Sequence, residues 1–196
     1  MAHKSILREN SPYFQRMFSF PGKEVTENKV EIKHADPRIM YWVLEFMYTG
    51  AYAPPDGTTV STEYCNHDRA SYKYATASAG GILKKKCPCA GKTTSPNHLL
   101  AHIHVYSIAD YFGMRTLMAF AQQKVVEVLH VHWQDDKLQL KNALEKAFSN
   151  TPEYNRGLRQ VLIDVLKAHP GLWVDDGDVR SWLDAHLRVR EEVDYA

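Results

Sequence analysis

The sequence predicts a mostly helical α+β fold with a small sheet and a C-terminal helical extension. Three observations support this prediction. Apolar residues recur at helical spacing through most of the chain. Helix start signals, Ser or Asp followed by Pro, precede the first two of the main helical segments. One short segment, Val30-Glu31-Ile32-Lys33, alternates apolar and polar residues instead, which is typical of a half-buried strand.

The first two main helices have well-marked ends. Ser11 can cap a helix that has Pro12 at its first position, with an apolar face of Tyr13, Phe14, Met17 and Phe18. A second helix opens at Asp36-Pro37 and closes at Thr49-Gly50. Apolar residues cover most of its circumference, so we expect it to be sandwiched within a core.

Residues 53–97 interrupt the helical pattern. Pro, Gly, Ser, Thr and Lys residues dominate this stretch, and it has little periodicity. Because a loop of this length is uncommon inside a compact domain, we interpret it as a flexible surface insertion that is dispensable for folding.

Helical periodicity returns at Leu99 and continues to Val128, with a break at Gly113. A third group of helices is predicted over 136–190, with one helix starting at Thr151-Pro152. That helix carries an apolar stripe that must dock on the rest of the chain or on a partner: Leu158, Val161, Leu162, Val165 and Leu166.

The composition excludes several classes of protein. Of 196 residues, 44% are hydrophobic, 24 are Lys or Arg and 23 are Asp or Glu, so the chain is neither disordered nor strongly charged. The near-neutral balance gives no electrostatic basis for nucleic acid as the main partner. No apolar run is long enough to cross a membrane or resembles a signal peptide, and three cysteines make no disulfide framework. We expect an intracellular protein, in the cytoplasm, the nucleus or both.

Several short motifs occur in an order that resembles the BTB/POZ family. They are His3-Lys4 with Ile6-Leu7, Ser11-Pro12-Tyr13-Phe14, Met17-Phe18, Val30-Glu31-Ile32, Asp36-Pro37, Phe46-Met47-Tyr48-Thr49-Gly50 and Val105-Tyr106-Ser107-Ile108-Ala109-Asp110-Tyr111-Phe112-Gly113, followed by Leu117 and Ala121. The resemblance implies helical hairpins around a small sheet. It divides the chain into a BTB/POZ-like domain, 1–129, interrupted by the insertion at 53–97, and a C-terminal helical extension, 130–196.

The resemblance also implies a function. BTB/POZ domains are non-enzymatic protein-interaction modules that are usually homodimeric. Many are adaptors that hold a substrate for a cullin-type ubiquitin ligase, and others act in transcription. The contact surface is expected on the N-terminal helices, with the interface residues Ile6, Leu7, Tyr13, Phe14, Phe20 and Glu24.

Two departures from the family pattern carry expectations of their own. Family members have a strand hairpin ahead of the His3-Lys4 pair, whereas this sequence starts at Met1. We therefore expect a weak or heterogeneous dimer. Cullin-binding members carry a hydrophobic-x-acidic triplet, which falls on 22–24. Glu24 supplies the acid, but Gly22 replaces the hydrophobe, with Phe20 close by.

A second function class rests on the insertion. Cys65, His67, Cys87 and Cys89 are soft ligands of the kind that a structural zinc site uses, although one residue separates each pair instead of two to four. His98 and His102 lie one helical turn apart nearby. The alternatives are thus a zinc- or nucleic-acid-binding regulator, or a flexible loop with free thiols, with no metal and no cofactor. We find none of the common catalytic motifs, and expect no enzyme.

The predicted core combines both halves of the BTB/POZ-like region. Its expected members are Phe14, Met17, Phe18, Val30, Ile32, Val43, Phe46, Tyr48, Tyr106, Ala109, Leu117 and Ala121.

Overall fold

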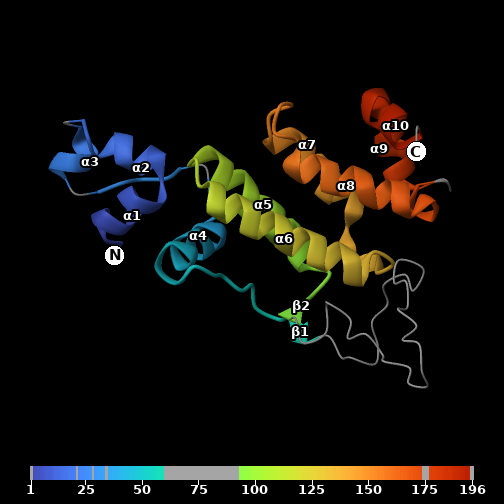
Figure 1. Ribbon diagram of the computed structural model, residues 1–196, viewed down its shortest axis with the longest axis horizontal. Helices are drawn as coiled ribbons and strands as arrows, with labels where there is room; N and C mark the ends of the chain where they lie inside the picture. Colours follow the sequence, from blue (N-terminus) through green and yellow to red (C-terminus); the bar gives the residue numbers. More distant parts are fainter. Residues whose placement is uncertain are drawn as a thin grey trace, which may run out of the picture.

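The computed structural model describes residues 2–20, 22–27, 29–33, 35–59, 93–173 and 177–194. The described chain is mostly helical, which confirms the predicted fold class (Figure 1). Its elements are α1 (Lys4–Asn10), α2 (Pro12–Met17), α3 (Lys23–Thr26), α4 (Pro37–Thr49), β1 (Thr58–Thr59), β2 (Thr93–Thr94), α5 (His98–Tyr111), α6 (Arg115–His132), η2 (Asp136–Leu138), α7 (Leu140–Asn150), α8 (Arg156–Ala168), η3 (Pro170–Leu172), α9 (Asp178–Ala185) and α10 (Leu187–Asp194).

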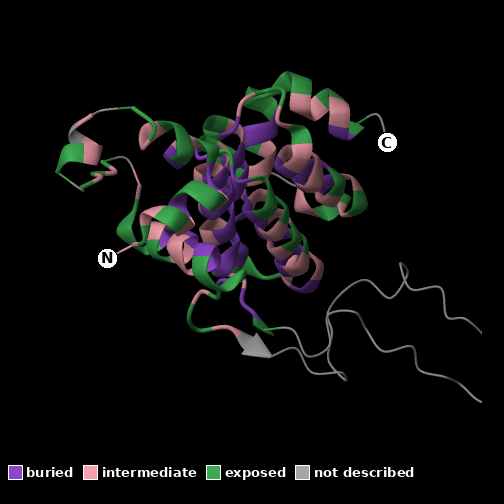
Figure 2. Cartoon of the chain, turned by 60° about the vertical axis from the view of Figure 1, so that its left-hand side comes forward, coloured by how far each residue is buried: buried purple, intermediate pink, exposed green. Residues whose placement is uncertain are grey.

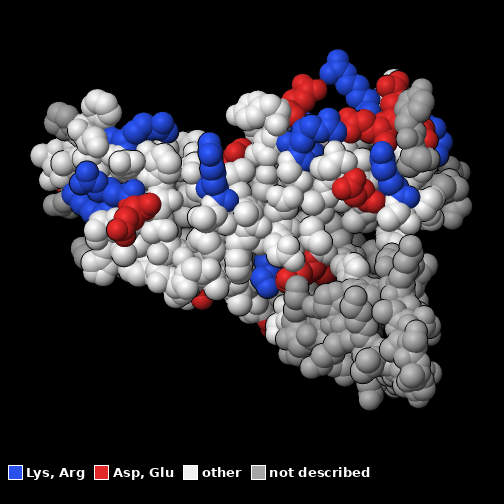
Figure 3. All heavy atoms as spheres, in the orientation of Figure 1, with Lys and Arg blue, Asp and Glu red and all other residues white. Residues whose placement is uncertain are grey.

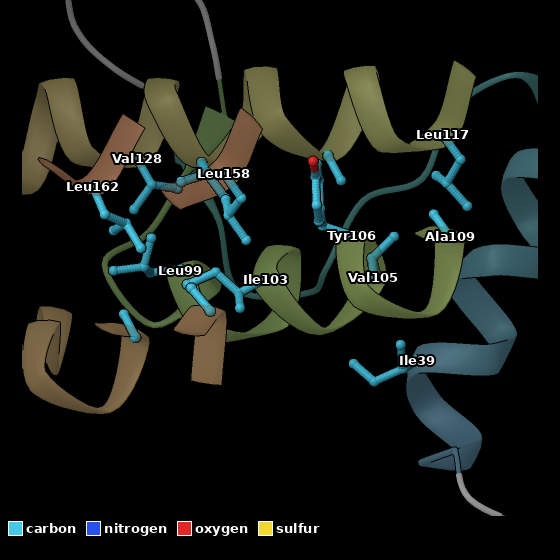
Figure 4. Packing of buried hydrophobic residues seen from close by; sticks show 14 of the residues in the cluster. Ile39, Leu99, Ile103, Val105, Tyr106, Ala109, Leu117, Val128, Leu158 and Leu162 are labelled. Atoms are coloured by element: carbon cyan, nitrogen blue, oxygen red, sulfur yellow. The ribbon is translucent and has the colours of Figure 1, made fainter. Parts of the chain in front are cut away.

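The helices α5 and α6 form an antiparallel pair at the centre of the molecule (Figure 1). The turn between them needs a left-handed residue, and Gly113 supplies it with a φ of 69°. Leu99, Ile103 and Tyr106 lie between the two helices in Figure 4 and are almost fully buried. Because α5 is buried on several sides, it can hold helices on more than one face.

Helices α1, α2, α4 and α7 to α10 contribute buried residues to one hydrophobic core together with this pair (Figure 2). α4 packs on α5, and α1 packs on α4. α7 packs on α5 and α8 on α6, so the apolar stripe of α8 is used within the chain. Its residues Leu158, Leu162 and Leu166 are buried, whereas Val161 and Val165 are half-buried.

The predicted strand at 30–33 is wrong. Among the described residues the only strands are β1 and β2, which pair antiparallel with Thr58 opposite Thr94. The alternation reflects burial alone: Val30 and Ile32 are half-buried against the core, while Glu31 and Lys33 are exposed. A strand also needs a neighbouring backbone to hydrogen-bond with, and none of the described strands lies beside this segment.

The helix predicted at Thr151-Pro152 begins later, at Arg156. Thr151 instead closes α7, because its hydroxyl donates to the carbonyl oxygen of Ala147 at 2.6 Å. Threonine hydroxyls commonly make this bond to a carbonyl one turn back. The Thr151-Pro152 pair therefore marks the end of α7 and not the start of α8.

Most of the predicted core is confirmed by burial. Its buried members are Phe14, Val43, Phe46, Tyr106, Ala109, Leu117 and Ala121. Four others pack only partly against the core: Met17, Phe18, Val30 and Ile32. The prediction that Tyr48 belongs to the core is wrong, since its side chain is 45% exposed. Its phenol lies at the surface, where it accepts a hydrogen bond from the backbone N–H of His3 at 2.7 Å.

The insertion begins and ends in ordered structure. β1 and β2 pair at its two ends, and Thr94 and Ser95 are buried. The expectation of a flexible insertion over 53–97 therefore does not hold at these ends. Residues 60–92, which hold the Cys65, His67, Cys87 and Cys89 zinc candidates, lie outside the described residues.

Candidate protein-interaction surface

The N-terminal helices are held on the rest of the molecule through Ser11, which lies between α1 and α2. The Ser11 hydroxyl donates to the carbonyl oxygen of Phe112 at 2.8 Å and accepts the backbone N–H of Phe14 at 3.4 Å. Gly113 lies beside the ring of Pro12, where a Cβ would make only ordinary van der Waals contact at 3.5 Å, so its positive φ is what favours glycine here. One buried hydroxyl thus fixes both the start of α2 and its distance from the end of α5.

The predicted interface residues divide into two groups. Leu7 and Phe14 point into the core, and Phe14 is only 2% exposed. Ile6, Tyr13 and Glu24 are half-buried, and Phe20 is 69% exposed. Of the predicted interface residues, those four are therefore available to a partner, with Phe20 the most accessible.

The sequence reasoning missed Tyr111 as an interface residue. Its ring is 65% exposed at the end of α5. The ring centroid of Tyr13 lies 5.4 Å from that of Tyr111 and 5.1 Å from that of Phe112. The Ala109-Asp110-Tyr111 motif is the sequence signal that marks this position. Tyr13 and Tyr111 together form an aromatic surface beside the N-terminal helices.

A hollow of about 490 Å³ lies beside these rings. Ile32 and Ile108 contribute apolar walls, and Lys33 and Ser107 contribute polar groups. Burial, aided by a hydrogen bond with Tyr111, raises the pKa of Tyr13. Its phenol therefore stays protonated at neutral pH and remains a hydrogen-bond donor. This mix of rigid aromatic rings and polar groups is typical of protein-binding surfaces.

The two histidines that the sequence placed near a zinc site have other partners. His98 donates from Nε2 to the carbonyl oxygen of Pro55 at 2.6 Å, and His102 Nδ1 shares a hydrogen bond of 2.8 Å with the Tyr52 hydroxyl. Burial lowers the pKa of His102 to about 3, so its imidazole is neutral. Within the described ranges no group of three His, Cys, Asp or Glu side chains converges. These contacts hold Tyr52 and Pro55, at the start of the insertion, against α5.

The described helices also bear on a membrane role. None of those in the described part of the chain combines the length and the hydrophobicity that a bilayer crossing requires. Together with the surface above, the described residues offer packing groups and hydrogen-bond donors for a protein partner.

The N-terminal region of the chain is similar in sequence to known proteins. Residues 1–66 match the family model described as the BTB/POZ domain. Over 48 residues the chain is 38% identical to "Kelch-like protein 38" of Homo sapiens. That alignment covers 24% of this chain and 8% of the relative, so the chain corresponds to a small part of that protein.

Proposed function

We infer from the BTB/POZ domain sequence carried by residues 1–66 that this chain is a non-enzymatic protein-interaction module. The single observation that supports this function in the structure is the aromatic surface of Tyr13 and Tyr111, with its hollow of about 490 Å³. Aromatic side chains with partly exposed rings carry a large share of the binding energy in protein interfaces. The family also supports an intracellular location, in the cytoplasm, the nucleus or both.

We further propose an adaptor role on a cullin-type ubiquitin ligase. Glu24 lies on α3 and remains half-buried at the surface. A side chain at Gly22 would meet the Glu24 carboxylate, which lies 2.8 Å from the position of a Cβ. We propose that Phe20, which is 69% exposed, supplies the apolar contact that Gly22 does not.

Biolayer interferometry tests this role by measuring how tightly the chain binds a purified cullin N-terminal domain. Phe20→Ala and Tyr111→Ala should each weaken binding at least tenfold, because truncating a hot-spot aromatic costs 2 kcal/mol or more. Tyr154→Ala is the matched control, since Tyr154 is 86% exposed in the turn before α8. If the parent chain does not bind, or if all three variants bind equally, the adaptor role is wrong.

Dimerisation is proposed through the same N-terminal helices. Leu7 and Phe14 are used within the subunit, so a two-fold contact would rest on Ile6, Tyr13 and Phe20. This small apolar set supports a weak or heterogeneous dimer. Light scattering over a concentration series should show a rising average mass that Phe20→Glu abolishes. A stable monomer at high micromolar concentration would overturn the proposal.

The domain division is proposed in the same way. Residues 1–129 form the interaction domain, with the insertion between its halves, and 130–196 form an extension that supports it. The packing of α7 on α5 and of α8 on α6 favours this arrangement. Limited proteolysis should then cut within the insertion before it cuts the α6–α7 connection.

A further inference from the structure

A second hollow lies far from the N-terminal helices, among α7, α8, α9 and α10. Its volume is about 790 Å³. This volume lies within the range of ligand sites, about 300–1,000 Å³, and can accept a few side chains of a peptide. Figure 3 shows charged side chains of both signs gathered over these helices.

The floor of the hollow is apolar and rigid. The rings of Phe148 and Trp182 meet edge to face with centroids 5.2 Å apart. His186 stacks on Trp182 at 4.1 Å, and its Nδ1 donates to the Trp182 carbonyl oxygen at 2.7 Å. Ile163 lies below, 2% exposed, and Leu187 stands at the rim, 63% exposed. Rings fixed in this way lose little conformational freedom when a ligand binds.

The carboxylates that line the hollow already have cationic partners. Arg156 pairs with Glu192 at 2.5 Å, and Arg188 pairs with Glu153 at 3.3 Å. Glu145 lies 3.9 Å from Lys141, which is outside the lining.

Two lining cations have no such carboxylate. Lys146 is exposed and makes no ion pair with any other described residue. Arg159 donates from Nε to the Thr151 hydroxyl and from Nη2 to backbone carbonyl oxygens, so its hydrogen bonds within the described part of the chain include no carboxylate. Its guanidinium also lies 4.8 Å from the Phe148 ring centroid. The charge left over in the hollow is therefore positive.

We propose that this hollow binds a short acidic peptide segment of a protein partner, with one or two aliphatic anchor residues between its carboxylates. The aliphatic anchors contact Phe148 and Leu187 above the buried Trp182, and the carboxylates pair with Lys146 and Arg159. The site is independent of the aromatic surface of Tyr13 and Tyr111. It would give the chain a second docking position on its C-terminal helices.

Fluorescence anisotropy with the full chain tests the proposal. The probe is a fluorescein-labelled octapeptide with two Leu residues and four Glu residues. Its first control has Lys in place of each Glu, and its second has Gly in place of each Leu. The acidic, Leu-containing probe should bind at least tenfold more tightly than either control. Equal or tighter binding of the Lys peptide, or no saturable binding up to 1 mM, which corresponds to only about 4 kcal/mol, would overturn the proposal.

Two variants with the same charge change locate the binding site. Lys146→Glu should weaken the binding of the acidic probe about tenfold, because it replaces an attraction between charges with a repulsion. Lys137 is exposed and does not line the hollow, so Lys137→Glu should change the affinity for the acidic probe less than twofold. Equal effects of the two variants would mean that only net charge matters, and the site would be wrong.

Nuclear magnetic resonance gives a readout that does not depend on a variant. The indole N–H signal of Trp182 should move on titration with the acidic probe, and that of Trp42, which lies on α4, should stay unchanged. Movement of Trp42 alone would place the peptide elsewhere and overturn the assignment.

Discussion

The Ser11 hydroxyl and the Phe112 carbonyl oxygen, 101 residues apart in the chain, are joined by a buried hydrogen bond of 2.8 Å. Ser11 is fully buried, and the bond holds the N-terminal helix pair against the end of α5. The aromatic surface of Tyr13 and Tyr111 depends on this contact, because each tyrosine is a near neighbour of one of the two bonded residues.

Replacing Ser11 with Ala should lower the free energy of unfolding by about 1–3 kcal/mol, since it leaves the Phe112 carbonyl without its partner and removes a helix cap. Urea titration measures the change. Ser19→Ala is the control, because the Ser19 hydroxyl bonds only to Gln15 one turn earlier at an exposed position. Comparable stability of the two variants would contradict the role given to Ser11.

Phe14→Ala should cost about 3–5 kcal/mol of unfolding free energy, as expected for a buried aromatic ring. Its ring centroid lies 4.9 Å from that of Phe112. Phe20→Ala at an exposed position should change stability by about 0.5 kcal/mol or less. If chemical denaturation finds Phe14→Ala as stable as the parent chain, the packing of α2 is wrong.

Stability should fall in acid because of His102. The pKa of this imidazole is lowered to about 3 by burial, below the usual value of about 6.5, so the unfolded chain binds a proton more readily than the folded one. The contribution is fully present above about pH 6.5 and is lost as the pH falls towards 3, by at most about 1.4 kcal/mol per pH unit.

The His102→Gln variant isolates this contribution, because glutamine does not titrate. The difference in unfolding free energy between parent and variant should narrow as the pH falls from 6.5 to 4. If the difference in unfolding free energy stays constant over this range, His102 takes up its proton as readily in the folded chain as in the unfolded one, which would contradict the lowered pKa.

Arg159 should matter more for stability than its neighbour Arg156. Arg159 bonds to the Phe148 and Thr151 carbonyl oxygens and closes the C-terminal end of α7, so Arg159→Ala should cost about 1.5–3 kcal/mol. The Arg156–Glu192 pair is exposed, so Arg156→Ala should cost less than about 1 kcal/mol. Thermal melts of the two variants compare them directly, and the reverse order would refute this account of α7.

Removal of residues 60–92 should be tolerated if the paired ends remain. A short Gly/Ser linker between Thr59 and Thr93 should leave the melting temperature within a few degrees, because loop length changes closure entropy only slightly. Removal of all of 53–97 should cost more, since it deletes the Pro55 carbonyl that His98 contacts and the buried Thr94. Equal melting temperatures of the two deletion variants would show that residues 53–59 and 93–97 contribute nothing to stability.

The amino-acid pattern is enough to predict the helical class, the caps at Ser11 and Asp36, and most of the buried positions. These features depend on periodicity and on contacts within a few residues. Asp36, for example, accepts the backbone N–H of Arg38 at 2.8 Å, as its place before Pro37 predicted. Val43, Phe46 and Leu117 are buried for the same reason, since their spacing fixes the inward face of a helix.

The surfaces that a partner can reach depend instead on how the helices pack in three dimensions. The pattern at 30–33 is that of a strand, yet a strand requires a second backbone at its edge, and spacing along one chain does not supply one. Tyr48 and Tyr111 both carry aromatic rings in family motifs, but their exposure depends on which helices pack beside them. The hollow around Trp182 likewise joins residues of four helices, so its charge balance follows from distances across the fold rather than from their order in the chain.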